Sequence, residues 1–235
     1  MRALRILNGV DFILCEDTRV TDKLLKHYNI KTPAVSYKEF SGLKKINYTL
    51  NLLKQGKKLA LVSGTGMPAF SEMGGKLAQA VIDKFGTPSP YEGEGGGEVG
   101  IEFVLGHSAV TAALSMSGIP ADKFIFMGFP PYKKEKQAFI KKILAGEFPV
   151  VVYESKYRII KFLEELCNLA KSAEEKTEET KGVETLHCNV STVVVCREFS
   201  KMHETVYRGN IKTIIEKIKN NKDDQKGEFV VIIGK

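Results

Sequence analysis

The sequence predicts an α/β protein with mainly parallel strands, on three observations. Short β-branched or aliphatic runs alternate with amphipathic stretches of helical length. Runs such as Val150–Tyr153 and Phe229–Ile233 are apolar or aromatic at every position, as in strands buried on both faces. Glycine and proline separate many of these segments. Helices between doubly buried strands favour parallel pairing, because the helices then cover both faces of the sheet.

We expect the strands at these residues: Phe12–Leu14, Leu59–Val62, Ile101–Leu105, Phe124–Met127, Val150–Tyr153, Val190–Cys196 and Phe229–Ile233. We expect helices at Arg2–Leu7, Thr21–Tyr28, Ser71–Lys84, Ser108–Ser117, the lysine-rich stretch after Pro131, and Tyr157–Ala170.

A domain boundary is expected near Gly118-Ile119-Pro120, because the proline ends a helix rich in small residues. This gives an N-terminal α/β domain at 1–119 and a C-terminal one at 120–235. The segment Thr87–Gly100 is rich in glycine and acidic residues and predicts a flexible loop. The polar segment Ala170–Gly182 is either a helix extension or a surface loop.

The composition is that of a folded globular protein, with 43% hydrophobic and 27% charged residues. No run approaches the roughly 20 apolar residues that span a bilayer, and no apolar signal segment follows Met1. We therefore expect a cytoplasmic protein without a membrane partner. The net charge of +7 weakly favours an anionic partner such as RNA.

The four cysteines are far apart and form no CxxC pair: Cys15, Cys167, Cys188 and Cys196. This spacing predicts reduced, structural thiols and no metal site.

Polar and glycine-bearing motifs follow the strands predicted in the first half. Cys15–Arg19 (CEDTR) lies where open α/β sheets bind ligands, although the motif taken alone fits a capped helix start better. Ser63–Pro68 (SGTGMP) lets backbone N–H groups approach a nucleotide-like cofactor, or is a tight strand-to-helix connection. It lacks the lysine of a P-loop. Gly106–Ala109 forms a third such loop.

Two motifs in the second half, Tyr153–Arg158 (YESKYR) and Cys196–Lys201 (CREFSK), each combine an acid with an arginine. Such pairs are often structural ion pairs. A lysine cluster follows Phe129-Pro130-Pro131 and is either a solvated helix face or a phosphate-binding surface. Its members are Lys133, Lys134, Lys136, Lys141 and Lys142.

Taken in order, these segments resemble the family of ribosomal RNA small-subunit methyltransferase I, a branch of the tetrapyrrole methylase superfamily. The family pattern is CEDTR, SDAGTP, PGPSA, GF-P, YESPHR, ARELTK and a final GEF strand. This chain reads CEDTR, SGTGMP, LGHSA, GFP, YESKYR, CREFSK and GEF in the same order. The match covers nearly the whole chain.

The resemblance implies a two-domain tetrapyrrole-methylase-like fold with S-adenosylmethionine in the cleft between the domains, and a homodimer. It also implies 2′-O-methylation of a decoding-centre cytidine in the 16S ribosomal RNA of the small subunit, without a metal. The motifs do not determine which residue takes the proton. The candidate catalytic residues are Glu16, Asp17, Arg19 and Glu154, of which Glu16, Asp17 and Glu154 are the candidate proton acceptors, in that order. The implied cofactor-binding residues are Ser63, Gly64, Thr65, Gly66, Pro68, Gly106, Ser108, Ala109 and Tyr153. The implied RNA-binding residues are Arg19, Lys133, Lys134, Lys136, Arg158 and Arg197.

The chain departs from the family pattern at the cofactor loops. Gly64 and Met67 replace an aspartate and a threonine, and LGHSA lacks both prolines of PGPSA. The family's opening strand and its PIGN-type loop have no counterpart before Met1. Two explanations stay open: a sequence that starts after the first strand but has working loops, or a decayed cofactor site. The alternative functions are accordingly a non-catalytic RNA-binding relative and a small-molecule (tetrapyrrole) methylase, because a fold does not fix a substrate.

Overall fold

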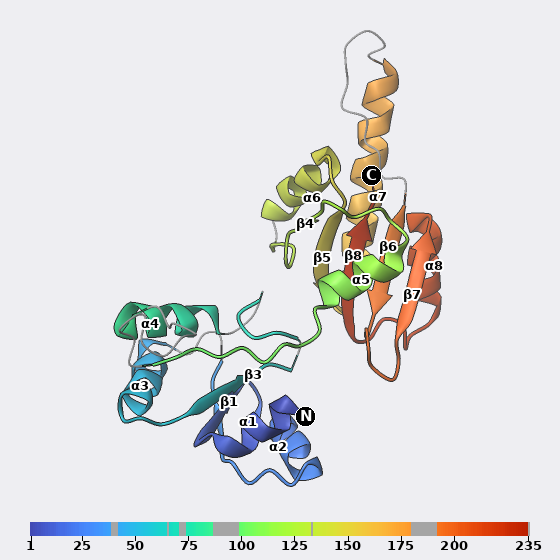
Figure 1. Cartoon of the computed structure of the whole chain (residues 1–235). Helices are drawn as coiled ribbons and strands as arrows, with labels where there is room; N and C mark the ends of the chain where they lie inside the picture. Colours follow the sequence, from blue (N-terminus) through green and yellow to red (C-terminus); the bar gives the residue numbers. More distant parts are fainter. Residues whose placement is uncertain are drawn as a thin grey trace. The chain divides into compact units, whose positions relative to one another are not determined.

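The structure is a computed structural model that describes residues 1–38, 42–64, 66–70, 74–86, 99–132, 134–179 and 192–234. The chain divides into two compact units, Met1–Ser108 and Ala109–Lys235 (Figure 1). The boundary predicted at residue 119 lies at the other end of helix α5 (Ala109–Ser117). This helix belongs to the C-terminal unit because Val110, Ala113 and Leu114 pack against the strands of that unit.

The N-terminal unit is built on a three-stranded parallel sheet in the order β2-β1-β3. In chain order its elements are α1 (Arg2–Gly9), β1 (Phe12–Cys15), α2 (Thr18–His27), β2 (Ala34–Ser36), α3 (Leu43–Lys54), β3 (Leu59–Val62) and α4 (Gly75–Phe85). Neighbouring residues of β1 point to opposite faces of the sheet. Ile13 packs in a cluster with residues of α1 and α2, whereas Leu14 packs in a cluster with residues of α3 and α4.

The C-terminal unit contains a five-stranded sheet in the order β4-β5-β8-β6-β7. After α5 come β4 (Ile125–Phe126), α6 (Glu135–Ala145), β5 (Val150–Ser155), α7 (Ile159–Glu179), β6 (Val193–Arg197), β7 (Thr205–Gly209), α8 (Ile211–Asn220) and β8 (Glu228–Ile233). Strands β4 and β5 are parallel, and the other three pairings are antiparallel.

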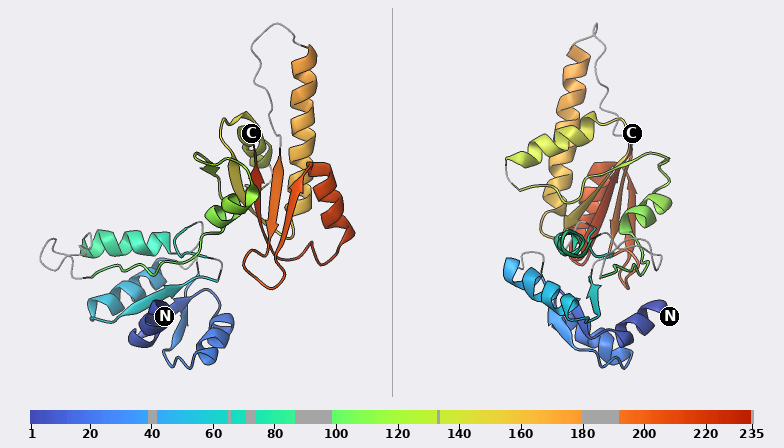
Figure 2. Two further views of the ribbon diagram at one scale, coloured as in Figure 1. Left: turned by 45° about the vertical axis from the view of Figure 1, so that its right-hand side comes forward. Right: turned by 60° about the vertical axis from the view of Figure 1, so that its left-hand side comes forward.

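The predicted α/β class is confirmed, and parallel pairing is confirmed in the N-terminal unit. In the C-terminal unit the expectation of mainly parallel pairing was wrong. Helices cover both faces of this sheet, so the interiors of its central strands are apolar whatever the direction of the strands. Val151, Val194 and Ile232 pack in one cluster with α5, whereas their neighbours in the chain pack in another with α6, α7 and α8. Figure 2 shows helices on both sides of this sheet.

Most predicted strands and helices occur at the predicted positions, but Ile101–Leu105 forms no strand. Ile101 packs against the core of the N-terminal unit, whereas Phe103 and Leu105 are exposed. An apolar run predicts burial, but a strand also needs a hydrogen-bonding neighbour, and the described residues provide none here. Helix α7 confirms the helix extension as far as Glu179. The loop predicted at Thr87–Gly100 lies almost wholly outside the described residues.

Four elements were not predicted: β2, α3, β7 and α8. Strand β2 has only three residues, too few to show a period. Helix α8 did carry a signal, since Ile211, Ile214, Ile215 and Ile218 recur at helical spacing.

Three of the four cysteines, Cys15, Cys167 and Cys196, are described, and all are buried free thiols, as predicted. Cys188 lies outside the described residues. None of the described helices is long and apolar enough to cross a bilayer. Within the described ranges, no group of three or more His, Cys, Asp or Glu side chains is placed to hold a metal ion.

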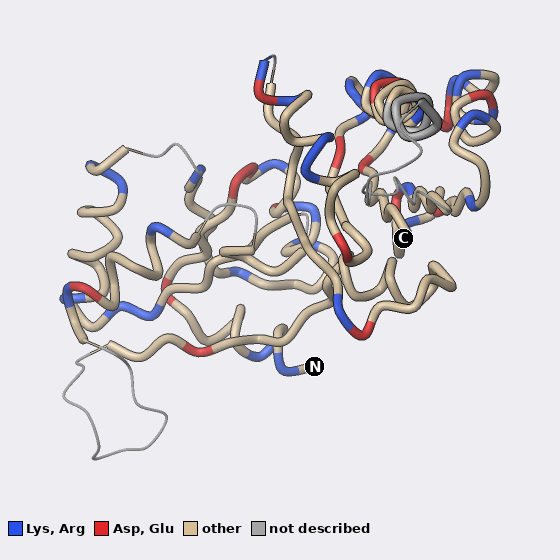
Figure 3. The backbone as a smooth tube through the Cα atoms, turned by 90° about the horizontal axis from the view of Figure 1, so that it is seen from above, with Lys and Arg blue, Asp and Glu red and all other residues tan. Residues whose placement is uncertain are grey.

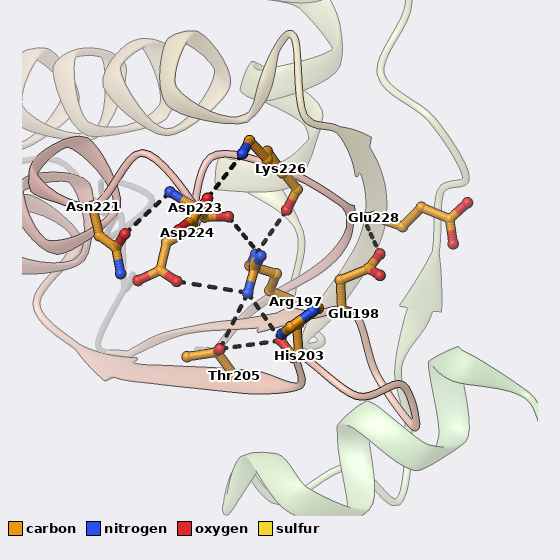
Figure 4. Close-up of polar contacts among 9 residues, drawn as sticks. All are labelled: Arg197, Glu198, His203, Thr205, Asn221, Asp223, Asp224, Lys226 and Glu228. Atoms are coloured by element: carbon orange, nitrogen blue, oxygen red, sulfur yellow. Dashed lines mark hydrogen bonds and ion pairs between the residues drawn. The ribbon is translucent and has the colours of Figure 1, made fainter.

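Arg197 at the end of β6 is buried, and its guanidinium lies inside the C-terminal unit (Figure 4). It donates hydrogen bonds to the carbonyl oxygens of Lys226 (2.7 Å), His203 (2.9 Å) and Asp223 (2.6 Å). The Asp224 carboxylate is 3.6 Å from it. These contacts tie the β6–β7 turn to the segment before β8. The donors of Arg197 are used inside the unit, which gives it a structural role, and its contact with RNA stays a prediction.

Glu198, the next residue, ties the same two segments together at the surface. Its carboxylate accepts hydrogen bonds from the Glu228 N–H (2.8 Å) and from Lys201 Nζ (3.2 Å). Gly227 has a φ of +100°, and a Cβ there would lie 2.5 Å from the Glu198 side chain. The CREFSK and GEF motifs are thus parts of one structural unit.

We expect Arg197→Met to lower the free energy of unfolding by about 3 kcal/mol or more, because three backbone carbonyl oxygens and Asp224 lose the buried partner that joins them. Arg197→Lys should recover only part of this loss, since an ammonium cannot reproduce the planar fork of donors. Urea denaturation followed by circular dichroism measures both variants.

The matched control is Lys226→Gln, which removes the exposed ion pair between the Lys226 side chain and Asp223 but keeps the carbonyl that Arg197 uses. This change should cost roughly 0.5 kcal/mol or less. A cost for Arg197→Met as small as that of the control would contradict the structural role.

Candidate active site

The CEDTR motif lines an open polar pocket in the N-terminal unit. The pocket, of about 400 Å³, is lined by Glu16, Asp17, Thr18, Arg19, Ser36 and Lys38. Cys15 and Ser36 are paired at the ends of the parallel strands β1 and β2. The lining residues therefore come from the carboxyl ends of adjacent parallel strands, where open α/β sheets bind ligands.

Asp17 is the N-cap of helix α2 and holds Arg19. Its carboxylate accepts the Arg19 backbone N–H at 2.9 Å, and the guanidinium binds it at 3.0 and 2.7 Å. The side-chain hydrogen bond from Arg19, helped by the backbone one, lowers the pKa of Asp17 to about 2. The capped helix start is confirmed, and the same residues line a pocket, where ligand binding stays a prediction.

Glu16 differs from Asp17 because it is exposed in the pocket and is not part of the helix cap. The pocket combines two carboxylates with two cationic side chains, so it can bind a polar ligand and offer an oxygen to a proton. Sequence reasoning missed Ser36 and Lys38, because it did not identify β2. Their only signal was the short segment after Pro33, which pairs Ala34 and Val35 with the buried Tyr37.

The loop after β3 carries most of the predicted cofactor-binding residues. Gly64 and Gly66 are exposed, and a Cβ built at either would meet no atom within 4 Å. Their backbone is therefore open to a ligand, as close approach to a nucleotide-like cofactor requires. Ser63 and Pro68 are partly buried at the two ends of the loop, and Thr65 lies outside the described residues.

Two of the predicted cofactor loops meet within the N-terminal unit. The Gly106 N–H donates to the sulfur of Met67 at 3.2 Å. Met67, one of the departures from the family pattern, thus takes up a backbone donor of the LGHSA loop. Ser108 ends this unit, and Ala109 begins α5 in the other.

Glu154 and Arg158 of the YESKYR motif form a buried ion pair in the C-terminal unit. Arg158 Nε lies 2.9 Å from Glu154 Oε1, which also accepts the Ser155 N–H at 2.7 Å. Burial raises the pKa of Glu154, and the charge of Arg158 opposes this. Glu154 is only 1% exposed, so a ribose hydroxyl cannot reach it within this unit. Glu154 holds Arg158 in place, and its catalytic role stays a prediction.

Arg158 also makes internal contacts beyond Glu154, and its contact with RNA stays a prediction. It donates to the Pro130 carbonyl at 2.9 Å, and its guanidinium lies 4.4 Å from the centre of the Tyr132 ring. Tyr153, predicted to bind cofactor, packs edge-on against Phe126 and Phe129.

The lysines predicted to bind RNA differ in exposure. Lys136 is buried, 3.1 Å from Glu165, and its ammonium lies over the Phe162 ring. Lys134 is exposed just before α6, and Lys133 lies outside the described residues. Figure 3 shows that Lys and Arg occur along both units and are not gathered in one segment.

Comparison with known proteins gives the family. The sequence profile of the tetrapyrrole (corrin/porphyrin) methylases matches residues 1–215. The ribosomal RNA small subunit methyltransferase I of Hydrogenobaculum sp. (strain Y04AAS1) is 33% identical, over 100% of this chain and 89% of that protein. The protein of the same name from Thermotoga maritima is also 33% identical, over 99% of this chain and 90% of that one.

Two solved structures are similar in fold. The cobalamin-biosynthetic cobalt precorrin-4 methyltransferase aligns with a TM-score of 0.60 at 17% identity, over 100% of this chain and 87% of that one. The uroporphyrin-III C-methyltransferase of Thermus thermophilus aligns with a TM-score of 0.58 at 16% identity, over 100% and 86%. The ordered motifs, the profile match and the full-length relatives lead to one conclusion: the chain belongs to the ribosomal RNA small-subunit methyltransferase I family, within the tetrapyrrole methylases.

Proposed function

We propose that the protein transfers a methyl group from S-adenosylmethionine to small-subunit ribosomal RNA. The observation that carries this proposal is the polar pocket formed by the CEDTR motif, in a chain with full-length relatives named for this activity. The finer proposal is 2′-O-methylation of a cytidine ribose in the decoding centre of 16S ribosomal RNA, by a cytoplasmic homodimer. The interdomain cofactor cleft that the family implies stays a prediction.

The residues present fit the cofactor at the Ser63–Pro68 loop, where Gly64 and Gly66 leave the backbone open. When bound, S-adenosylmethionine supplies a methyl group on a sulfonium centre, which a ribose oxygen can displace in line. The chain's own tasks are to orient the ribose and to take the proton of its hydroxyl group.

Glu16 is the carboxylate best placed to take that proton. Glu154 is buried, and Asp17 is both fixed by Arg19 and a weak base because its pKa is about 2. Glu16 is exposed in the same pocket and lies outside the helix cap that Asp17 forms. Arg19, with its guanidinium held in place by Asp17, is the proposed phosphate contact beside it.

A non-catalytic RNA-binding protein is the second candidate, and the contact between Met67 and the Gly106 N–H favours it. If the cofactor has to accept a hydrogen bond from the Gly106 N–H, the sulfur of Met67 competes with it for this donor. Isothermal titration with S-adenosylmethionine separates the two candidates: binding supports the enzyme, and no heat at high ligand concentration supports the second.

Methyl transfer tests the proposed function directly. The full chain is incubated with labelled S-adenosylmethionine and small ribosomal subunits that lack the modification. We expect label in the 16S RNA, at a nucleotide whose 3′ phosphodiester resists alkali, because a 2′-O-methyl group removes the attacking hydroxyl. Label in a corrin precursor but not in RNA would contradict the proposal and favour the small-molecule methylase.

Glu16→Gln should lower the methylation rate about a hundredfold or more, because an amide cannot accept the proton. Cofactor affinity, measured by titration, should stay within about twofold of the wild type, since no charge on the Ser63–Pro68 loop changes. Glu154→Gln serves for comparison, and its main effect should be on stability. A rate for Glu16→Gln close to that of the wild type would remove Glu16 from the mechanism.

The pKa of Asp17 gives a test of the pocket's electrostatics. In the wild type this carboxyl should titrate near pH 2 by carbon-detected NMR, and Arg19→Gln should move its pKa up toward the ordinary value of 3.8. A lowered pKa adds stability above pH 4, which is lost as the pH falls toward 2. Asp17 is thus ionised throughout the neutral range. A methylation rate that rises between pH 5 and 8 would exclude Asp17 as the base, because Asp17 does not titrate there.

A further inference from the structure

Large aromatic side chains are exposed on two loops of the C-terminal unit. The exposed fractions are 47% for Phe129, 75% for Tyr132 and 84% for Tyr157. Rings this exposed contribute little to the core, and a group of exposed apolar side chains often marks an interaction site.

The two loops leave the same edge of the sheet. Phe129 and Tyr132 follow β4, Tyr157 follows β5, and these strands are parallel neighbours. The pairing continues past β4, because the Tyr153 N–H donates to the Gly128 carbonyl at 2.9 Å. Arg158 then joins the loops through its hydrogen bond to the Pro130 carbonyl.

Each tyrosine has a cation beside its ring. The Arg158 guanidinium is 4.4 Å from the centre of the Tyr132 ring, and Lys156 Nζ is 4.9 Å from that of Tyr157. The buried Glu154 fixes Arg158, and this holds Tyr132 in place. Each ring is otherwise mostly open, so a second planar group can stack on it.

The charge around these rings favours a polyanion over an apolar protein partner. Exposed lysines dominate both loops and the helix that follows β4: Lys134, Lys141, Lys142 and Lys156. Glu135 is the exposed acid among them. Rings that stack bases beside cations that neutralise phosphates are the combination that binds single-stranded nucleic acid.

We propose that Tyr132 and Tyr157 form a stacking platform for unpaired nucleobases of the RNA, with Arg158 as a positioning residue beneath Tyr132. The platform rests on the proposed function in one respect, that RNA is the substrate. It adds that the enzyme holds unpaired nucleotides of this RNA by ring stacking on the C-terminal unit.

The test uses the full chain and a short fluorescein-labelled single-stranded RNA, alone or annealed to its complement, with binding followed by anisotropy. We expect Tyr132→Leu and Tyr157→Leu each to weaken single-strand binding about tenfold, within the range for loss of one stacked base. Duplex binding should change by less than about twofold, because paired bases offer no free face. Tyr132→Phe and Tyr157→Phe should bind as the wild type does, since the ring is kept.

Two controls separate stacking from charge and from general surface effects. Tyr48→Leu removes another exposed tyrosine, from α3 of the N-terminal unit, and should leave binding unchanged. Lys156→Gln should reduce the slope of log binding constant against log salt concentration by about one, because one phosphate contact is lost. The leucine variants should keep the wild-type slope.

Single-strand binding by both leucine variants within twofold of the wild type would overturn the platform, and so would a wild type that binds no RNA. Methylation of small subunits by the wild type reports separately on the proposed function. If the wild type methylates small subunits and the leucine variants bind single strands as the wild type does, the proposed function is supported and the platform is not. If the wild type does not methylate and the leucine variants lose single-strand binding, the platform is supported and the proposed function is not.

Discussion

Helices cover both faces of the central strands in each unit, and this constraint decides where polar chemistry can lie. The interiors of β1, β5, β6 and β8 are apolar on both sides, so a charged side chain in them would have to be paired or neutral. Polar groups are therefore concentrated where the strands end. The CEDTR pocket, the Glu154–Arg158 pair and the Arg197 cluster all lie at such ends.

Two residues of the same type can have different roles at these strand ends, and their degree of burial distinguishes the roles. Arg19 is exposed and held on one side by Asp17, so part of its guanidinium faces solvent. Arg197 has its donors taken by backbone carbonyls inside the unit. Likewise Glu16 is open in a pocket, whereas Glu154 is enclosed. The family's motifs thus divide into one that lines a pocket and others that hold loops in place.

The loops in which the chain departs from its family also have a physical description. Replacing an aspartate by Gly64 removes a side chain and opens the backbone, which keeps room for a ligand. Replacing a threonine by Met67 does the opposite, because its sulfur accepts the Gly106 N–H. Gly64 thus favours ligand binding at the proposed cofactor site, whereas Met67 opposes it. A measurement of cofactor affinity shows which of the two effects is larger.

The sequence by itself determined the α/β class, most of the strands and helices, the family and the location of the polar motifs at strand ends. These follow from local periodicity and from motif order, which need no knowledge of the third dimension. Only the tertiary structure decided the strand directions in the C-terminal unit and the place of Ser36 and Lys38 in the pocket. It also decided the internal contacts of Arg158, Arg197 and Lys136. Burial and hydrogen-bond partners depend on contacts between segments far apart in the chain, such as Arg197 with the Lys226 carbonyl. No local pattern reports whether a charged side chain ends in a pocket or inside the fold.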